Sequence, residues 1–204
     1  MKIPTVTIVD YGAGNLRSVA KAFEATGYPV QITDNDKDIL KAKVVIFPGQ
    51  GACGPAMNNL RNKNLGNAIV EVINNGVPFF GVCLGLQLLL EFSEEGSTKC
   101  LGVAPGKTVL LPHDVKIPHM GWNSVELHYE HPVFTGVRDG EFFYFVHSYY
   151  GTPDDKDLVL GTTQYGVNFC SVLAKDNVIA TQFHPEKSGS VGLKLYENFL
   201  KFMT

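Results

Sequence analysis

The chain has 204 residues, a length that suits one domain able to bury a sizeable core. Its formal charge of −3 and its mean hydropathy of +0.03 give no reason to expect nucleic acid or an anionic membrane as a partner. No apolar stretch approaches the roughly 20 residues of a membrane-spanning helix, and the first residues lead into a strand pattern rather than a signal sequence. We therefore expect a cytoplasmic protein.

The first half of the chain alternates between strand and helix patterns. Apolar runs rich in β-branched residues predict strands over 5–9, 30–33 and 44–47. Helical patterns cover 16–25, which Gly27 would end, and 67–75, which Gly76 would end. Such alternation predicts an α/β fold with a mostly parallel central sheet flanked by helices.

The pattern changes in the second half. Between residues 109 and 179, short strand patterns are separated by Gly, Pro and Asp turns, which predicts an antiparallel extension of the sheet. A last helix is expected over 191–202. No linker or repeat interrupts this order, so we expect a single domain over residues 1–204.

A cysteine flanked by glycines follows the apolar run 77–80, in the order Gly81-Val82-Cys83-Leu84-Gly85. The spacing is typical of a nucleophile elbow, where a strand turns sharply into a helix and only glycine leaves enough room beside the nucleophile. The dipole of that helix would favour the thiolate, and its free N–H groups could stabilise an oxyanion. Taken alone, the motif fits a buried structural cysteine equally well.

A second motif, Gln182-Phe183-His184-Pro185-Glu186, favours the catalytic interpretation. Pro185 disfavours a helical His184, and residues i and i+2 of an extended segment share a face. His184 would then act as the base for Cys83, and Glu186 would orient the imidazole, as in a catalytic triad. The alternative is a structural histidine with a hydrogen-bond partner.

Other chemistries lack part of their motif. The H-x-E of a zinc deaminase requires a downstream cysteine pair, and no cysteine follows Cys170. Gly12-Ala13-Gly14 lacks the third glycine of a dinucleotide fingerprint because Arg17 stands in its place. The four cysteines show neither metal spacing nor a disulfide framework. We therefore expect no metal and no other cofactor.

Segments 81–87 and 183–186 together resemble the class I glutamine amidotransferases, which hydrolyse glutamine through a cysteinyl thioester and pass on ammonia. Further segments are similar to those of the glutaminase subunits of imidazole glycerol phosphate synthase: DYGAGNL (10–16), PHMGWN (118–123), YFVHSY (144–149) and QFHPEKS (182–188). The resemblance covers essentially the whole chain. It implies a triad of Cys83, His184 and Glu186.

The surroundings of the triad can be assigned in the same way. The N–H of Leu84, next after the nucleophile, is expected to be one oxyanion donor. The resemblance implies a second donor at Gln50, where the family usually has valine and where flanking glycines would let the peptide rotate. It also implies that Gly51, Gln87 and the backbone of His147, Ser148 and Tyr149 bind glutamine.

The resemblance also implies a partner. Ammonia released into water would be protonated, so the family couples the glutaminase to a (β/α)₈-barrel cyclase subunit that makes imidazole glycerol phosphate and aminoimidazole carboxamide ribonucleotide in histidine biosynthesis. Trp122 fits either an interface anchor or a core residue. Lys187 is expected on the opposite side of the extended segment from the catalytic face. The implied interface residues of this heterodimer are Asn15, Pro118, Met120, Trp122, Asn123, Tyr144 and Lys187.

Three alternatives stay open at this point. The glutaminase that feeds pyridoxal phosphate synthase has a similar length and the same triad, although the Gly-Trp-Asn loop and the Asp-Tyr-Gly-Ala-Gly-Asn start argue against it. A cysteine peptidase-like hydrolase would act on peptides rather than on glutamine. A non-catalytic interaction module would not require the three triad residues.

Overall fold

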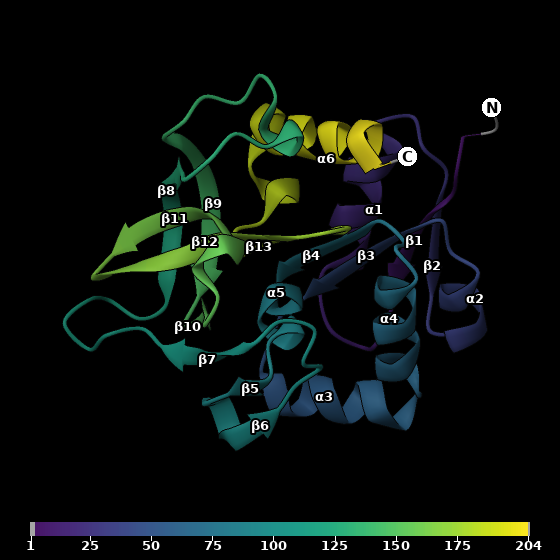
Figure 1. The fold of residues 1–204 in the computed structure, drawn as a ribbon, viewed down its shortest axis with the longest axis horizontal. Coiled ribbons are helices and arrows are strands. Elements are labelled where there is room, and N and C mark those ends of the chain that lie inside the picture. The colour runs from purple at the N-terminus through teal and green to yellow at the C-terminus, as the bar shows by residue number, and fades with distance from the viewer. Residues whose placement is uncertain (1–2, 204) are drawn as a thin grey trace.

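One sheet of thirteen strands runs through the protein in the computed structural model, which describes residues 3–203. Its parallel part has the strand order β2-β1-β3-β4-β13. In that order the strands span Val30–Thr33, Val6–Val9, Val44–Gly49, Phe79–Cys83 and Val178–Thr181. This part lies at the centre of the molecule, between helices (Figure 1).

The sheet continues beyond β13 with antiparallel strands. β12 pairs with β13, β10 with β12 and β7 with β10, while β11, β8 and β9 branch from β12 (Figure 1). These features confirm the predicted α/β fold with an antiparallel extension. The remaining strands are β5 (Phe92–Ser93), β6 (Thr98–Lys99), β7 (Gly106–Leu110), β8 (His119–Leu127), β9 (Glu141–His147), β10 (Tyr149–Pro153), β11 (Val159–Tyr165) and β12 (Val167–Lys175).

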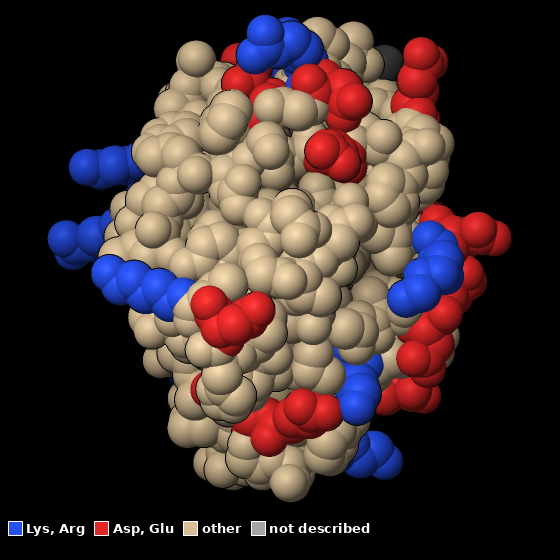
Figure 2. All heavy atoms as spheres, turned by 90° about the vertical axis from the view of Figure 1, so that its left-hand side faces the viewer, with Lys and Arg blue, Asp and Glu red and all other residues tan. Residues whose placement is uncertain are grey.

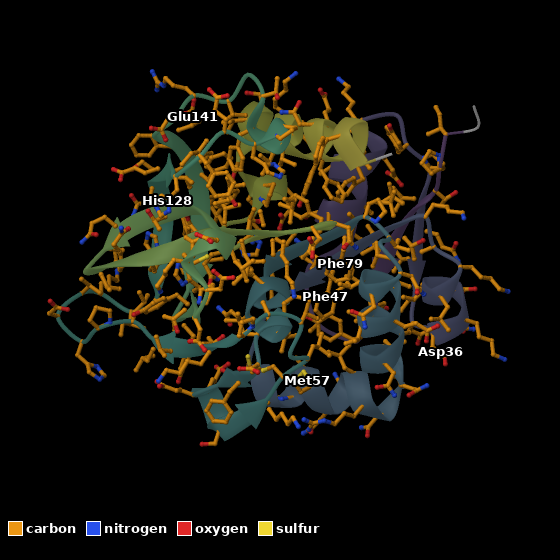
Figure 3. All side chains as sticks on the ribbon, viewed as in Figure 1. Asp36, Phe47, Met57, Phe79, His128 and Glu141 are labelled. Atoms are coloured by element: carbon orange, nitrogen blue, oxygen red, sulfur yellow. The ribbon has the colours of Figure 1, made fainter. Side chains whose placement is uncertain are left out.

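Helices cover both faces of the parallel strands, which explains why these strands are apolar without alternation. In β3, Val44 and Ile46 belong to the apolar cluster under α1 and α6, whereas Val45 and Phe47 belong to the cluster under α3 and α4. Phe47 and Phe79 point into this second layer (Figure 3). The helices are α1 (Leu16–Glu24), α2 (Asp36–Leu40), α3 (Cys53–Asn62), α4 (Leu65–Asn74), α5 (Leu84–Leu89) and α6 (Gly189–Met203). No helix within residues 3–203 is both long and apolar enough to cross a membrane.

The strands and helices predicted with bounds agree with the observed ones to within two residues at either end, but α2, α3, β5 and β6 were not predicted. α2 is only five residues long and begins after Asn35, whose side chain accepts from the Lys37 N–H. α3 begins with Cys53, Gly54 and Pro55. Gly and Pro ordinarily indicate a turn, yet proline is tolerated in the first turn of a helix because its missing N–H has no partner there.

The carboxyl ends of three neighbouring parallel strands meet at one edge of the sheet. Gly49 of β3 pairs with Cys83 of β4, and Val82 of β4 pairs with Thr181 of β13. Ligands of open α/β sheets bind outside this edge of the strands. The fold therefore brings three distant segments of the sequence, 49–51, 83–84 and 182–184, to one place.

Candidate active site

Cys83 is the last residue of β4 and directly precedes α5. Its backbone has φ 54° and ψ −106°, a conformation that side-chain-bearing residues rarely adopt and that is typical of functional sites. A Cβ at Gly85 would collide with the carbonyl oxygen of Phe47. The structure thus confirms the predicted elbow and explains why a glycine follows it.

His184 and Glu186 form a buried pair beside the elbow. His184 Nδ1 and Glu186 Oε1 are 2.8 Å apart, and both side chains are almost inaccessible to solvent. The Tyr196 hydroxyl donates to the other carboxylate oxygen at 3.4 Å. Among the described residues, His184 Nε2 has no hydrogen-bond partner, so this nitrogen is free to exchange a proton with reacting groups.

The charge state of His184 is set by its neighbours. Burial alone would lower its pKa, but the Cys83 thiolate and the Glu186 carboxylate together outweigh burial and raise the pKa to about 10. His184 therefore keeps its proton at neutral pH. The protonated imidazole is thus held beside the Cys83 sulfur at the base of the site.

The Cys83 sulfur has two further contacts, neither of which was predicted. It lies 3.8 Å from the Val146 carbonyl oxygen, and the Gln182 side-chain amide donates to it at 3.6 Å. Gln182 is fully buried. One indication of this contact is present in the sequence: Gln182 directly follows an apolar strand, and a buried amide there needs a hydrogen-bond partner.

A cavity of about 330 Å³ opens over Cys83. It brings together all of the predicted oxyanion and substrate-binding residues, with two residues predicted for the partner interface. His184 and Glu186 do not line it. The lining residues are Gln50, Gly51, Cys83, Leu84, Gln87, Glu95, Pro118, Val146, His147, Ser148, Tyr149 and Lys187.

Glu95 is the one acidic residue of this lining and was missed in the sequence. Its Oε2 accepts a hydrogen bond of 2.7 Å from the Cys53 N–H at the start of α3. The stretch Glu94-Glu95-Gly96 is typical of a solvated charged turn, and only the tertiary fold turns Glu95 toward the cavity.

Gln87 lies on α5, one turn after Cys83, and its amide is held by the protein. Its Nε2 donates to the Tyr149 carbonyl at 2.7 Å and to Gln182 Oε1 at 3.2 Å. Both amide hydrogens are therefore used. Any direct contact of Gln87 with a ligand has to involve its Oε1.

Lys187 does not lie where the sequence predicted. Residues Pro185–Lys187 form a 3₁₀ turn, closed by a 3.0 Å bond from the Lys187 N–H to the His184 carbonyl, so the extended segment ends at His184. Residues three apart lie on the same side of such a turn. Lys187 therefore lines the cavity with Cys83, and the prediction that it points away from the catalytic face was wrong.

Apart from Pro118 and Lys187, the residues predicted for the interface lie outside the cavity. Met120 and Trp122 are 62% and 56% exposed, so the core alternative for Trp122 was wrong. The ring of Tyr144 lies 6.2 Å from the Trp122 ring and 5.9 Å from the Lys187 ammonium. Asn15 caps α1 by accepting from the Ser18 N–H at 3.4 Å.

No group of three or more His, Cys, Asp or Glu side chains between residues 3 and 203 is arranged to hold a metal ion. The four cysteines are buried and free. The groups at the cavity and its base include the Cys83 thiol, the His184 imidazole, and the Glu95 and Glu186 carboxylates.

Comparisons with known proteins identify the family of the chain. The model of the family "Glutamine amidotransferase class-I" matches residues 7–202. The chain is 51% identical over 197 residues to the imidazole glycerol phosphate synthase subunit HisH of Dehalococcoides mccartyi (strain CBDB1), with 96% of each chain covered. It is 50% identical over 194 residues to the same-named subunit of Aquifex aeolicus (strain VF5), with 94% of each covered.

The solved structure of PurLQS from Thermotoga maritima superimposes with a TM-score of 0.77 at 19% identity and covers 100% of both chains, which supports the fold. The family model and the two relatives extend over almost the entire sequence. The chain belongs to the class I glutamine amidotransferase family.

Proposed function

We propose that this chain is the glutaminase subunit of an imidazole glycerol phosphate synthase. It hydrolyses L-glutamine to glutamate and ammonia and delivers the ammonia to a cyclase subunit of histidine biosynthesis, which forms imidazole glycerol phosphate and aminoimidazole carboxamide ribonucleotide. The observation that carries the proposal is the buried pair His184–Glu186 beside the elbow cysteine at the base of a cavity. The names of the two relatives support the assignment to this synthase.

The reaction proceeds in two stages. The Cys83 thiolate attacks the side-chain amide carbon of glutamine, and the protonated Nε2 of His184 gives its proton to the departing nitrogen, which leaves as ammonia. Water then attacks the thioester while His184 Nε2 takes one of its protons, and glutamate leaves with release of the thiolate. Glu186 holds His184 through Nδ1 and keeps Nε2 directed at the reacting atoms.

The developing oxyanion needs donors beside Cys83. The N–H of Leu84 is the first of α5 and has no acceptor within the helix. We assign the second donor to the N–H of Gln50, which lies in the cavity lining beside the β3 end that pairs with Cys83. The positive φ of 94° at Gly51 supports a rotation of the Gln50 peptide, because glycine adopts such angles freely.

The amino acid end of glutamine carries both charges, and the lining offers groups for each. We assign its ammonium to Glu95, the acidic residue of the cavity. The carboxylate fits the backbone N–H groups of Ser148 and Tyr149, whereas Gln87 Oε1, which can only accept, would bind the ammonium. The Glu95 carboxylate already accepts a hydrogen bond from the Cys53 N–H, so it is held in place before substrate arrives. This reduces the entropy lost on binding.

The cyclase would cover the mouth of this cavity. Met120, Trp122, Phe142 and Tyr144 form an apolar surface on the β8–β9 hairpin, in which Trp122 pairs with Tyr144 and Met120 with Val146 of the cavity lining. The side of the molecule that carries β8 and β9 has a broad uncharged area (Figure 2). Apolar surfaces of this kind typically bind another protein.

The proposal includes a single amidotransferase domain over residues 1–204 and a cytoplasmic reaction. The family model extends over residues 7–202, and the four free thiols suit a reducing compartment.

The direct test is the release of glutamate from glutamine, with and without the cyclase subunit and its nucleotide substrate. Cys83→Ala should abolish release while the far-ultraviolet circular dichroism stays unchanged, because the nucleophile is lost with little volume. The free wild-type chain should be slower than the loaded complex by about 10²–10³, the usual effect of one missing oxyanion donor. Glutamate release by the pure variant, or peptide cleavage by the wild type, would overturn the proposal.

Glu186→Gln should lower the pKa of His184 from about 10, because one of the two groups that raise it is lost. A raised pKa stabilises the fold fully below pH 6.5 and ceases to do so as the pH rises to about 10. The wild type should therefore lose unfolding free energy across this range, and the variant should lose less. NMR titration of His184 and urea unfolding measure both effects. Turnover should fall less than in Cys83→Ala, and an unchanged His184 titration would contradict the role of Glu186.

Glu95→Gln should raise the KM for glutamine by about tenfold and change kcat little, because the lost charge acts on the bound ammonium in both ground and transition states. The glutamine side chain can still accept from the Cys53 N–H, so the start of α3 is preserved. Glu94→Gln is the matched control, since Glu94 is exposed and pairs with Lys107 at 2.9 Å. The KM values are measured by steady-state kinetics. Equal KM values in the two variants would show that Glu95 does not bind glutamine.

Lys187→Ala should weaken binding of the cyclase or its stimulation of the glutaminase, measured by titration calorimetry and by the coupled assay. The ammonium lies over Tyr144 at the apolar surface and also borders the cavity, so the KM for glutamine is measured separately and should be retained. Lys201→Ala, on the exposed face of α6, serves as the control. Unchanged affinity together with unchanged stimulation would show that Lys187 is a solvated surface lysine with no role in the interface.

A further inference from the structure

Two buried histidines that the proposed reaction does not use face each other between the β8–β9 hairpin and the cavity. His119 begins β8, His147 ends β9, and the two residues are paired in register. His119 Nδ1 and His147 Nε2 are 3.0 Å apart, and both side chains are buried. A direct bond between two histidine rings requires one nitrogen to donate and the other to accept.

The partners of the two rings determine which nitrogen carries each proton. His147 Nδ1 lies 2.9 Å from the Tyr149 carbonyl oxygen, which can only accept, so this nitrogen carries a hydrogen. Burial lowers the pKa of His147 to about 3 and that of His119 to about 4, so both rings are neutral at physiological pH. His147 Nε2 therefore accepts from His119 Nδ1.

The chain of donors begins at Asn123. Its Nδ2 lies 3.3 Å from His119 Nε2 and donates its other hydrogen to the Gln164 carbonyl at 3.0 Å. Its Oδ1 accepts from the Ser124 N–H at 2.9 Å, which fixes the orientation of the amide. A series of hydrogen bonds thus runs from Asn123 through the two histidine rings to the Tyr149 carbonyl. In each of these bonds only one of the two groups can be the donor.

The same carbonyl is connected to the nucleophile on its other side. It accepts from Gln87 Nε2 at 2.7 Å, Gln87 donates to Gln182 Oε1 at 3.2 Å, and Gln182 Nε2 donates to the Cys83 sulfur at 3.6 Å. Both lone pairs of the Tyr149 carbonyl are therefore occupied, one by the histidine pair and one by Gln87.

We propose that His119 and His147 are positioning residues for Cys83. By fixing the Tyr149 carbonyl they fix the amides of Gln87 and Gln182, and the Gln182 amide is thereby directed at the thiolate. The consequence for turnover rests on the proposed glutaminase function, whereas the hydrogen-bond arrangement itself does not.

A purely structural role is the competing explanation. The His119 ring also stacks on Tyr165, with centroids 4.0 Å apart, and on Phe145 at 4.9 Å. In that case the ring would fill space, and its nitrogen atoms would be irrelevant to the reaction. Two substitutions at position 119 separate the two roles.

His119→Phe keeps an aromatic ring between Tyr165 and Phe145 but removes both nitrogen atoms. His119→Asn loses the stacking but places an amide donor where Nδ1 was, in reach of His147. We expect kcat/KM for glutamine in the cyclase complex to fall about tenfold in His119→Phe, since a buried acceptor loses its donor, and to fall less in His119→Asn. A packing role predicts the reverse order. Equal losses in the two variants would also overturn the proposal.

Two measurements do not depend on glutamine turnover. The rate at which iodoacetamide alkylates Cys83 in the free chain, followed by mass spectrometry of its peptide, should fall in His119→Phe and be largely restored in His119→Asn. In the ¹⁵N NMR spectrum of the wild type, His147 should be protonated at Nδ1 and not at Nε2. Alkylation that both folded variants leave unchanged would refute the proposal. The opposite tautomer in the wild type would refute it even if His119→Phe did not fold. Absence of glutaminase activity in the wild type would refute the proposed function alone.

Discussion

The parallel pairing of β3, β4 and β13 is the constraint on which the rest of the site depends. The register that opposes Gly49 to Cys83 and Val82 to Thr181 ends all three strands at the same level. The chain must then leave the sheet at three neighbouring points, as the oxyanion segment, the elbow and the His184 segment. Because all three strands are buried on both faces, a slip of one residue would exchange the side chains that face the two helix layers and disrupt the packing of both. The same slip would separate the catalytic groups.

Three histidines are buried among the described residues, and they differ in charge: two are neutral and one is protonated. Burial by itself lowers the pKa of a histidine, as it does for His119 and His147, whose hydrogen-bond partners are all neutral. The positive charge on His184 lowers the pKa of His147 further. His184 is as deeply buried, yet the Cys83 thiolate and the Glu186 carboxylate raise its pKa to about 10. The neighbouring charges, rather than depth, decide which histidine exchanges protons. The two neutral rings can then serve as fixed donors and acceptors over a wide pH range.

Local patterns in the sequence were enough to predict the parallel strands, the elbow at Cys83 and the partnership of His184 with Glu186. The prediction of this pair was correct, but its argument was partly wrong: it assumed an extended segment through Glu186, whereas a 3₁₀ turn starts at Pro185. The same error placed Lys187 on the wrong side. Glu95 and the Gln182 amide could not be predicted, because their roles arise only when segments far apart in the sequence meet.

The two glycines around Gln50 are not equivalent, although the sequence presents them symmetrically. A Cβ at position 49 would collide with the Tyr11 hydroxyl and with the Leu84 Cβ, whereas a Cβ at position 51 would meet nothing within 4 Å. Gly49 is therefore required for close packing against the elbow, and Gly51 for its left-handed backbone. Any rotation of the Gln50 peptide has to be taken up on the Gly51 side, because β3 is held against Cys83 as far as Gly49. The movable part of the oxyanion segment thus begins where the strand pairing ends.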